Sequence, residues 1–327
     1  MIDIPILIQQ IGVLLLLILP GMALKWMRLA PEGLAVGLSN LILYIAQPVL
    51  FVAGFVAVDP TPAIVIRMLA VLVVAMVVHP LFFFVAKLCF RKAPKDKQKV
   101  LVFATTFSNA GFIGIPLMQA LFESTVPEIA IYASVYVAAF NVYVWSIGAY
   151  IFTEDKQYIS AKKMLLNPST VATYIGVALF ALSAIPEVRE AFIVPVFRQS
   201  EVVTSFMSNT TALVAPLSMA VVGLRLAELD VREALRSKYL YAYLPVSLLV
   251  IPTLSWILIK LVGIVGLYSD PLTTSVLLIS AATPAAAATS MFAEKYGGDA
   301  RFAGLVVSTS SVLCALTMPL VSLLGLL

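Results

Sequence analysis

The chain has 327 residues, of which 61% are hydrophobic and only 12% are charged, and its mean hydropathy is +1.04. A soluble domain carries about 25% charged residues and could not hide this much apolar surface in one core. The composition therefore excludes a soluble globular protein and predicts an integral membrane protein. The net charge of +4 does not indicate a nucleic-acid partner, because membrane proteins collect basic residues in the loops on one side.

Ten stretches are apolar over the roughly 20 residues that a helix needs to cross a bilayer. Transmembrane strands would alternate in polarity, whereas segments such as residues 71–78 are apolar all round, so we predict an all-α protein. The N-terminus has no basic region typical of a secretory signal, and we expect the first span to be retained. The predicted spans are 5–24, 34–57, 63–89, 99–122, 128–152, 168–186, 203–227, 239–267, 272–294 and 300–325.

The lysines and arginines are distributed unevenly between the two sides of these ten spans. All 21 of them except Arg67, Arg189, Arg198 and Lys260 fall on the side of the loop after the first span. By the positive-inside rule that side is cytoplasmic, and both termini face the outside. We expect a multi-pass protein of the plasma membrane, which is the inner membrane of a bacterium.

The longest polar segment on the basic side lies after the fifth span and divides the chain into two sets of five spans. Because five is an odd number, the second set would insert upside down relative to the first, as in inverted-repeat transporters. We therefore predict a first repeat at 1–153, a cytoplasmic linker at 154–167 and a second repeat at 168–327. A proline-containing pair, Gln47-Pro48 in span 2 and Ala215-Pro216 in span 7, agrees weakly with this division.

The fourth span of each set contains residues that interrupt helices near the middle of the bilayer. Serine and asparagine favour helix starts, glycine and proline interrupt helices, and proline suits a first turn. Thr283 is therefore expected to cap a half-helix that begins at Pro284. Each motif alone is more typical of a kink or a packing notch. The residues of the two motifs are Ser108, Asn109, Ala110 and Gly111 in span 4, and Thr283, Pro284 and Ala285 in span 9.

Together, the two motifs predict broken helices whose second halves begin at the centre of the membrane. The unpaired amides and the positive dipole end of each half-helix would then face the same space. Such backbone is tolerated at this depth only where it is buried in protein or lines a cavity. A carboxylate or similar anion is the ligand that these amides favour. We expect all seven motif residues to belong to a substrate site.

The motif residues also carry a resemblance to the auxin efflux carrier family, which includes the PIN-type auxin carriers of plants and many bacterial transporters. The matching segments are Ser108-Asn109, 114–117, 282–284, 292–296 and 318–320. The resemblance implies two inverted five-helix repeats, similar to bile-acid symporters and sodium–proton antiporters, with spans 4 and 9 crossing at their breaks. It also implies a scaffold of spans 1, 2, 6 and 7, a transport domain of spans 3–5 and 8–10, organic-anion substrates, and a possible homodimer through the scaffold.

Other polar residues inside the spans leave alternatives open. His79 in span 3, where the plant carriers have an Asp and a Lys, is either a neutral group hydrogen-bonded between helices or a proton-coupling group. Asn141 in span 5 either joins helices or contacts substrate. The hydroxyl-rich run 308–311 favours packing over a pathway lining. The thiols of Cys89 and Cys314 are expected to be ordinary and unpaired.

The 17 acidic residues, including Glu123, Asp270 and Glu294, fall in loops or near span ends. No carboxylate is therefore expected at the membrane centre to relay protons or bind sodium, and no metal or cofactor is predicted. An enzyme would need a nucleophile–base pair, paired acids or a metal set in the membrane, which the sequence does not offer. The favoured function is a secondary carrier that moves a small organic anion, such as a mono- or dicarboxylate, by alternating access. The alternatives are an ion-coupled symporter and a channel for another small solute.

Overall fold

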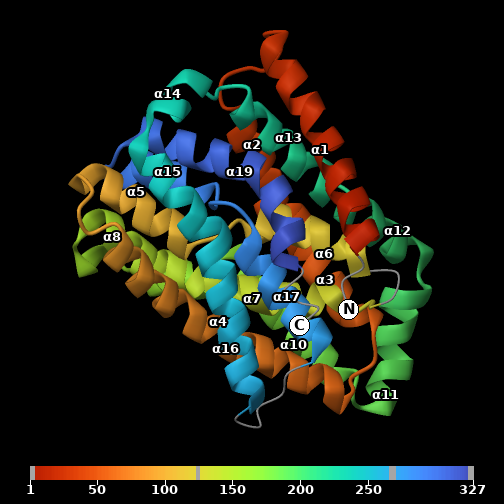
Figure 1. The fold of residues 1–327 in the computed structure, drawn as a ribbon. Coiled ribbons are helices and arrows are strands. Elements are labelled where there is room, and N and C mark those ends of the chain that lie inside the picture. The colour runs from red at the N-terminus through yellow and green to blue at the C-terminus, as the bar shows by residue number, and fades with distance from the viewer. Residues whose placement is uncertain (1–3, 123–125, 265–269, 323–327) are drawn as a thin grey trace.

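The computed structural model of the protein describes residues 4–122, 126–264 and 270–322. Every named element in these ranges is a helix, and the extended backbone includes one isolated antiparallel bridge. The helices pack against one another in a single body (Figure 1). The predicted all-α class is therefore confirmed. Glu123 and the last residues of predicted spans 239–267 and 300–325 lie outside the described residues.

Helices of the first half are partly joined by π-helical turns at Ile42–Ala46, Ala110–Gly114 and Val144–Gly148. These π turns continue the helix with one extra residue per turn and mark functional positions in many proteins. The helices are α1 (Ile4–Trp26), α2 (Leu34–Leu41), α3 (Gln47–Ala57), α4 (Pro62–Cys89), α5 (Lys95–Thr106), α6 (Ile115–Phe122), α7 (Ile129–Tyr143) and α8 (Ala149–Thr153).

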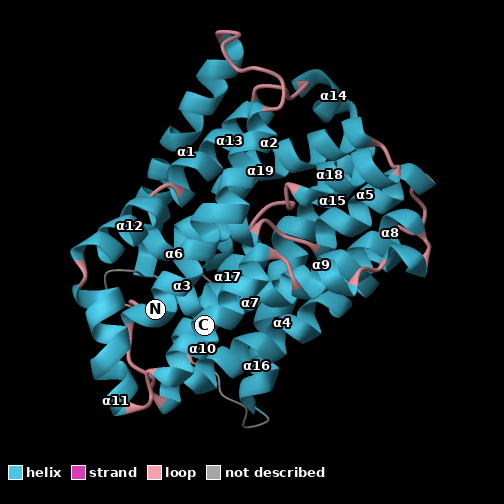
Figure 2. Cartoon of the chain, turned by 180° about the vertical axis from the view of Figure 1, so that it is seen from behind, coloured by secondary structure: helices cyan, strands magenta, loops and turns pink. Residues whose placement is uncertain are grey.

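Helices of the second half include π-helical segments at Arg189–Gln199 and Val246–Val250, and a short 3-10 helix, Lys156–Tyr158, precedes them. Figure 2 shows how little of the described chain lies in loops. The helices are α9 (Ala161–Leu165), α10 (Pro168–Leu182), α11 (Pro186–Val188), α12 (Glu201–Thr211), α13 (Val214–Leu226), α14 (Val231–Arg236), α15 (Lys238–Pro245), α16 (Ile251–Ile264), α17 (Pro271–Ala282), α18 (Ala288–Tyr296) and α19 (Ala300–Ser322).

Among the described residues, seven helical stretches are long and apolar enough to cross a membrane. Three shorter apolar helices, Ala110–Phe122, Pro271–Ala282 and Ala300–Cys314, correspond to predicted spans 4, 9 and 10. The count of ten spans stays a prediction. The seven long stretches are Ile8–Trp26, Leu34–Ala57, Pro62–Cys89, Ile129–Thr153, Lys156–Leu182, Glu201–Leu226 and Lys238–Gly263.

Several helix starts follow from a capping residue placed directly before a proline. In Thr61-Pro62, Asn167-Pro168 and Asp270-Pro271, the first side chain accepts a hydrogen bond from an amide of the first helical turn. The cap satisfies a free amide, and proline at the first helical position supplies a suitable φ angle without needing a hydrogen bond. These three pairs fix where α4, α10 and α17 begin.

Close packing of α1 along α13, and of α3 along α10, forms one side of the molecule (Figure 1). The first pair approaches closely because both helices present glycine: a Cβ on Gly21 would lie 2.1 Å from the Ala220 carbonyl oxygen, and one on Gly223 would lie 2.1 Å from that of Ile18. In span numbers the pairs are 1 with 7 and 2 with 6. In two repeats of five spans, span 1 corresponds to span 6 and span 7 corresponds to span 2. The pair 1 with 7 therefore corresponds to the pair 6 with 2, which is the pattern that two repeats require. The repeats and the two-domain division remain predictions.

The two broken helices lie at the centre of the protein. All residues of α17 from Thr273 to Ala282 are buried, as are those of α5 from Val100 to Thr106. The outer helices instead expose large apolar side chains, such as Leu69 and Phe84 of α4 at 56% and 66%. Because lipid is their expected surroundings, this exposure fits a membrane protein. The candidate site is therefore held by the most enclosed helices.

Candidate functional site at the crossing of two broken helices

The first break separates α5 from the helix Ala110–Phe122, which begins with a π turn and is called here the first half-helix. Residue Phe107 is extended, and the Asn109 carbonyl oxygen accepts bonds from the amides of Ile113 (3.0 Å) and Gly114 (3.3 Å). The amides of residues 110–112 donate to no acceptor in the described part of the chain. A helix that starts in this way presents free donors and a positive dipole end.

The second break separates α17 from α18, and it does not begin as predicted. Thr283 is extended, with φ −67° and ψ 154°, and its hydroxyl donates to the Ser280 carbonyl oxygen at 2.9 Å. It therefore closes the end of α17 and does not cap a helix at Pro284. The next helix starts only at Ala288, with no side-chain cap. The expected cap is wrong because residues 284–286 stay extended to pair with the first break.

The two breaks cross through an antiparallel bridge between Ser108 and Ala285. The Asn109 amide donates to the Pro284 carbonyl oxygen at 2.7 Å, and the Ala286 amide donates to that of Phe107 at 2.9 Å. The Ser108 hydroxyl adds a bond to the Ser280 carbonyl oxygen at 2.7 Å. The predicted crossing of the two broken helices is therefore what the backbone shows.

Helix α19 contacts the crossing through one serine of its hydroxyl-rich run, Ser310. The Ala285 amide donates to Ser310 Oγ at 3.2 Å, while that hydroxyl donates to the Val306 carbonyl oxygen at 2.7 Å. Its neighbour Ser311 donates only to Val307 of its own helix. The sequence favoured a packing role for the run 308–311, and Ser310 fulfils that role for the second break.

Seven of the predicted site residues are brought together at the crossing: Ser108, Asn109, Ala110, Gly111, Thr283, Pro284 and Ala285. Asn109 is 4% exposed. The carboxamide of its side chain, unlike its backbone amide, makes no hydrogen bond with the described residues. Gly114 permits the close approach of the two breaks, because a Cβ there would lie 3.3 Å from the Thr283 methyl carbon. Whether these residues bind substrate stays a prediction.

Asn141 is held by a different contact. Its Nδ2 donates to Thr170 Oγ1 at 3.3 Å and to Asn167 Oδ1 at 3.5 Å, which joins α7 to the start of α10. These bonds favour the helix-joining alternative over substrate contact. Its predicted role as a substrate-binding residue remains untested by these contacts.

His79 packs as an aromatic ring beside the first break. Its Nδ1 lies 2.7 Å from the Ala75 carbonyl oxygen of its own helix, so the expected hydrogen bond between helices is replaced by one within α4. The ring stacks on Tyr143 at 5.5 Å and 19°, and its centroid is 6.0 Å from that of Phe107. Because a carbonyl oxygen only accepts, Nδ1 carries the ring proton and donates it to Ala75. In the neutral ring the buried Nε2 is then an acceptor, and it has no partner among the described residues. A role in proton coupling stays a prediction.

Gln47 is a polar residue at the crossing that the sequence did not mark as part of the site. It is 1% exposed, its Oε1 accepts from Ser169 Oγ at 3.2 Å, and its Nε2 has no partner. The available signal was an amide near the middle of an apolar span, where polar groups are expensive and tend to be functional.

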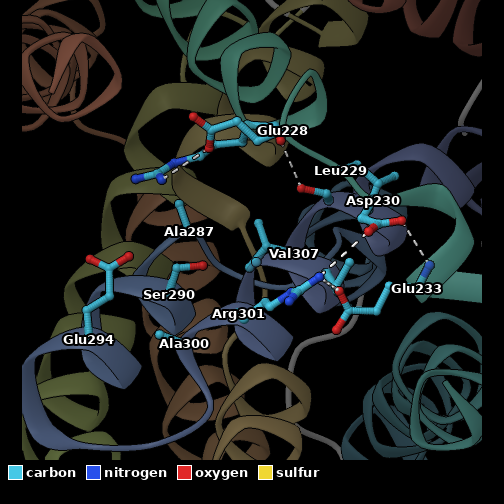
Figure 3. A pocket seen from close by; sticks show the side chains of 14 residues that line it. Glu228, Leu229, Asp230, Glu233, Ala287, Ser290, Glu294, Ala300, Arg301 and Val307 are labelled. Atoms are coloured by element: carbon cyan, nitrogen blue, oxygen red, sulfur yellow. Dashed lines mark hydrogen bonds and ion pairs between the residues drawn. The ribbon is translucent and has the colours of Figure 1, made fainter. Parts of the chain in front are cut away.

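Two cavities lie toward opposite ends of the broken helices. On the basic side, a cavity of about 240 Å³ lies between the α13–α14 connection and α18–α19, and reaches Ala287 and Ser290 at the start of α18 (Figure 3). Arg301 at its edge pairs with Glu233 at 2.5 Å and Asp230 at 3.7 Å. On the other side, a cavity of about 360 Å³ is lined by residues that include Arg67, Glu128 and Asp270, which form ion pairs.

Within the described ranges, no three His, Cys, Asp or Glu side chains gather as metal ligands would. The described carboxylates lie in loops or near helix ends, as expected from the sequence. The donors at the crossing are amides and hydroxyls, which can bind an anion or a polar group by hydrogen bonds.

Comparison with known proteins identifies one family. A family model described as a membrane transport protein matches residues 5–322, which is nearly the whole chain. No curated protein matches the chain.

Proposed function

Because the chain belongs to the membrane transport protein family, which is the family of the auxin efflux carriers, we propose that this transporter is a secondary carrier for a small organic anion, such as a mono- or dicarboxylate. The observation that carries the proposal is the set of free amides at residues 110–112, which begin a half-helix beside Asn109 at the crossing. Amides at a helix start bind carboxylates without a buried cation.

A carrier fits this crossing better than a channel. The two backbone hydrogen bonds of the antiparallel bridge join the breaks at the centre of the protein, and Asn109 is 4% exposed. Passage of a solute then requires the broken helices to move relative to their surroundings, which is alternating access. The cavities of about 240 Å³ on the basic side and about 360 Å³ on the opposite side would be the starting points of the two approaches.

The finer expectations from the sequence belong to the same proposal. The helix pairs α1–α13 and α3–α10 would form a static scaffold, and the broken helices would move within a transport domain. The basic side would face the cytoplasm and both termini the outside of the plasma membrane. The scaffold would also carry the surface of a homodimer.

Purified protein in liposomes tests the proposal through uptake of labelled mono- and dicarboxylates. Wild type should show saturable uptake of at least one of these anions. Asn109→Ala should reduce it about tenfold or more, since hydrogen bonds to charged groups contribute about 1.5–3 kcal/mol. Asn209→Ala, at an exposed asparagine of α12, is the matched control and should leave uptake unchanged.

Two results would contradict different parts of the proposal. Uptake by a folded Asn109→Ala variant at the wild-type rate would remove Asn109 from the substrate site. Absence of saturable uptake for every carboxylate, under imposed pH, sodium and voltage gradients in turn, would remove the organic-anion assignment.

A further inference from the structure

Gln47 occupies an unusual place in its span. It lies near the middle of the helical stretch Leu34–Ala57 and directly follows the π turn Ile42–Ala46. Its backbone amide donates to the Ile42 carbonyl oxygen. A side-chain amide at this depth is costly unless its donors and acceptor are all satisfied. π turns inside helices also occur frequently at functional sites.

The Gln47 side chain is only half satisfied. Its Oε1 accepts from Ser169 Oγ at 3.2 Å, which fixes the oxygen against α10. Its Nε2, which carries two N–H donors, is buried and has no partner in the described chain. Leaving a buried donor unpaired is unfavourable, and such groups in native proteins require an explanation.

The unpaired nitrogen faces the start of the first half-helix. A Cβ added to Gly111 would lie 3.3 Å from Gln47 Nε2, and no other atom outside the chain neighbours of Gly111 and its own helix backbone would lie within 4 Å of it. Gly111 itself is partly exposed. Gln47 Nε2 is therefore the neighbour of the first half-helix at this point, and a side chain on residue 111 would press against it.

The free amides of the half-helix open toward the same side. In a helix, the Cα–Cβ bonds tilt toward the N-terminus, which is also the direction of the first N–H groups. The amides of Ala110, Gly111 and Phe112 have no acceptor in the described chain. Donors without described acceptors thus come from two different spans, span 2 and span 4, and Gly111 is their point of closest approach in the described contacts.

From this arrangement we infer that Gln47 is a substrate-binding residue, which donates from span 2 to the same carboxylate that the amides of residues 110–112 bind from span 4. The inference rests on the proposed function and specifies how the anion is bound. One carboxylate satisfies donors on both sides, because its two oxygens accept about four hydrogen bonds. The bound anion then links a scaffold span to a moving span, so its affinity depends on their relative position.

The opposite orientation of the Gln47 amide makes a different prediction. With its oxygen toward Gly111, the side chain would cap the half-helix amides and would leave no place for an anion. Gln47→Glu, assayed at a pH high enough to ionise the glutamate, separates the two roles, because the carboxylate keeps the shape and supplies acceptors only. A capping role is preserved by glutamate, whereas a donor to an anion becomes a repelling charge.

The experiment measures KM and maximal rate in liposomes for the anion that wild type carries, and the thermal stability of each variant in detergent with and without it. Gln47→Leu should raise KM about tenfold and change the maximal rate less. Gln47→Glu should abolish saturable uptake and the stabilisation by the anion. Gln119→Leu in α6, which removes a partly buried glutamine of the same half-helix, is the matched control and should leave KM unchanged.

Gly111→Ala keeps the test decisive if the Gln47 variants do not fold. Its methyl group enters the space beside Gln47 Nε2, and it should raise KM about as much as Gln47→Leu. Wild-type KM in folded Gln47→Glu, or in folded Gly111→Ala, would overturn the inference. Failure of wild type to transport any carboxylate would instead contradict the proposed function, so the two failures are distinguishable.

Discussion

The two breaks at the centre of the protein differ in where their backbone hydrogen bonds go. After Asn109 the first half-helix begins at once, and the amides of residues 110–112 remain free. After Thr283 the chain stays non-helical to Ala287, and the amides of Ala285 and Ala286 are bonded to Ser310 and Phe107. The first break therefore leaves the amides directly after Asn109 free, whereas the second uses the amides of Ala285 and Ala286 to hold the crossing and leaves that of Ala287 without a described acceptor.

The side chains of the two breaks explain this difference. Pro284 has no amide to donate, and the alanines that follow it bring no polar side chain. The first break instead contributes an asparagine side chain and a glycine that lies close to Gln47 Nε2. The second break therefore acts as a brace between the two chain segments, and the proposed function places the binding of the anion at the first.

The largest effect is expected from removing a donor of the brace. Ala286→Pro deletes the amide that bonds to the Phe107 carbonyl oxygen and places the proline ring against it. A proline that removes a needed amide costs about 3 kcal/mol or more. The variant should lose most of its folded population, measured by gel-filtration yield and thermal unfolding in detergent.

Ala287→Pro is the matched control at the next position. Ala287 has φ −56° and precedes the first residue of α18, a place that suits proline, and its amide has no described acceptor. It should fold and unfold within about 1 kcal/mol of wild type. Equal stability of the two variants would show that the bond between Ala286 and Phe107 does not hold the breaks together.

A smaller effect is expected from the serine behind the brace. Ser310→Ala leaves the buried Ala285 amide without an acceptor and should lower the free energy of unfolding by about 1–2 kcal/mol. Ser311→Ala removes only a bond within α19 and should cost less than about 0.5 kcal/mol. Chemical unfolding in detergent compares the two, and the comparison between the breaks fails if Ser311→Ala proves the more damaging.

The sequence predicted the elements whose signals are local. Apolar length marked the spans, and Ser108-Asn109 and Thr283-Pro284 marked the breaks, because each depends on the chemistry of a few adjacent residues. The crossing entered through the family resemblance, and the structure confirms it at the bridge of Ser108 and Ala285.

The remaining features depend on partners that are remote in the sequence. The hydrogen-bond partners of Asn141 become visible only when α10 is placed beside it, and Ser310 is one hydroxyl in a run until Ala285 approaches it. Gln47 has a neighbour at Gly111 that no periodicity could reveal. Thr283 was misjudged for a related reason: pairing with the first break keeps the following residues extended, which overrides the preference of proline to start a helix.

The smallest effect is expected at Thr283. Replacing it tests whether its hydroxyl closes the end of α17 or caps the helix that follows the second break. Thr283→Val removes the hydroxyl but keeps the methyl group that lies toward Gly114. The Ser280 carbonyl oxygen, which accepts from Thr283, still accepts from Ser108 at 2.7 Å, so no buried acceptor is left unpaired. The loss should be about 0.5 kcal/mol in thermal unfolding, near the average for a hydrogen bond inside a membrane protein. A loss of about 2 kcal/mol would mean that the hydroxyl caps the second half-helix in the stable state, and the two breaks would then begin their half-helices alike.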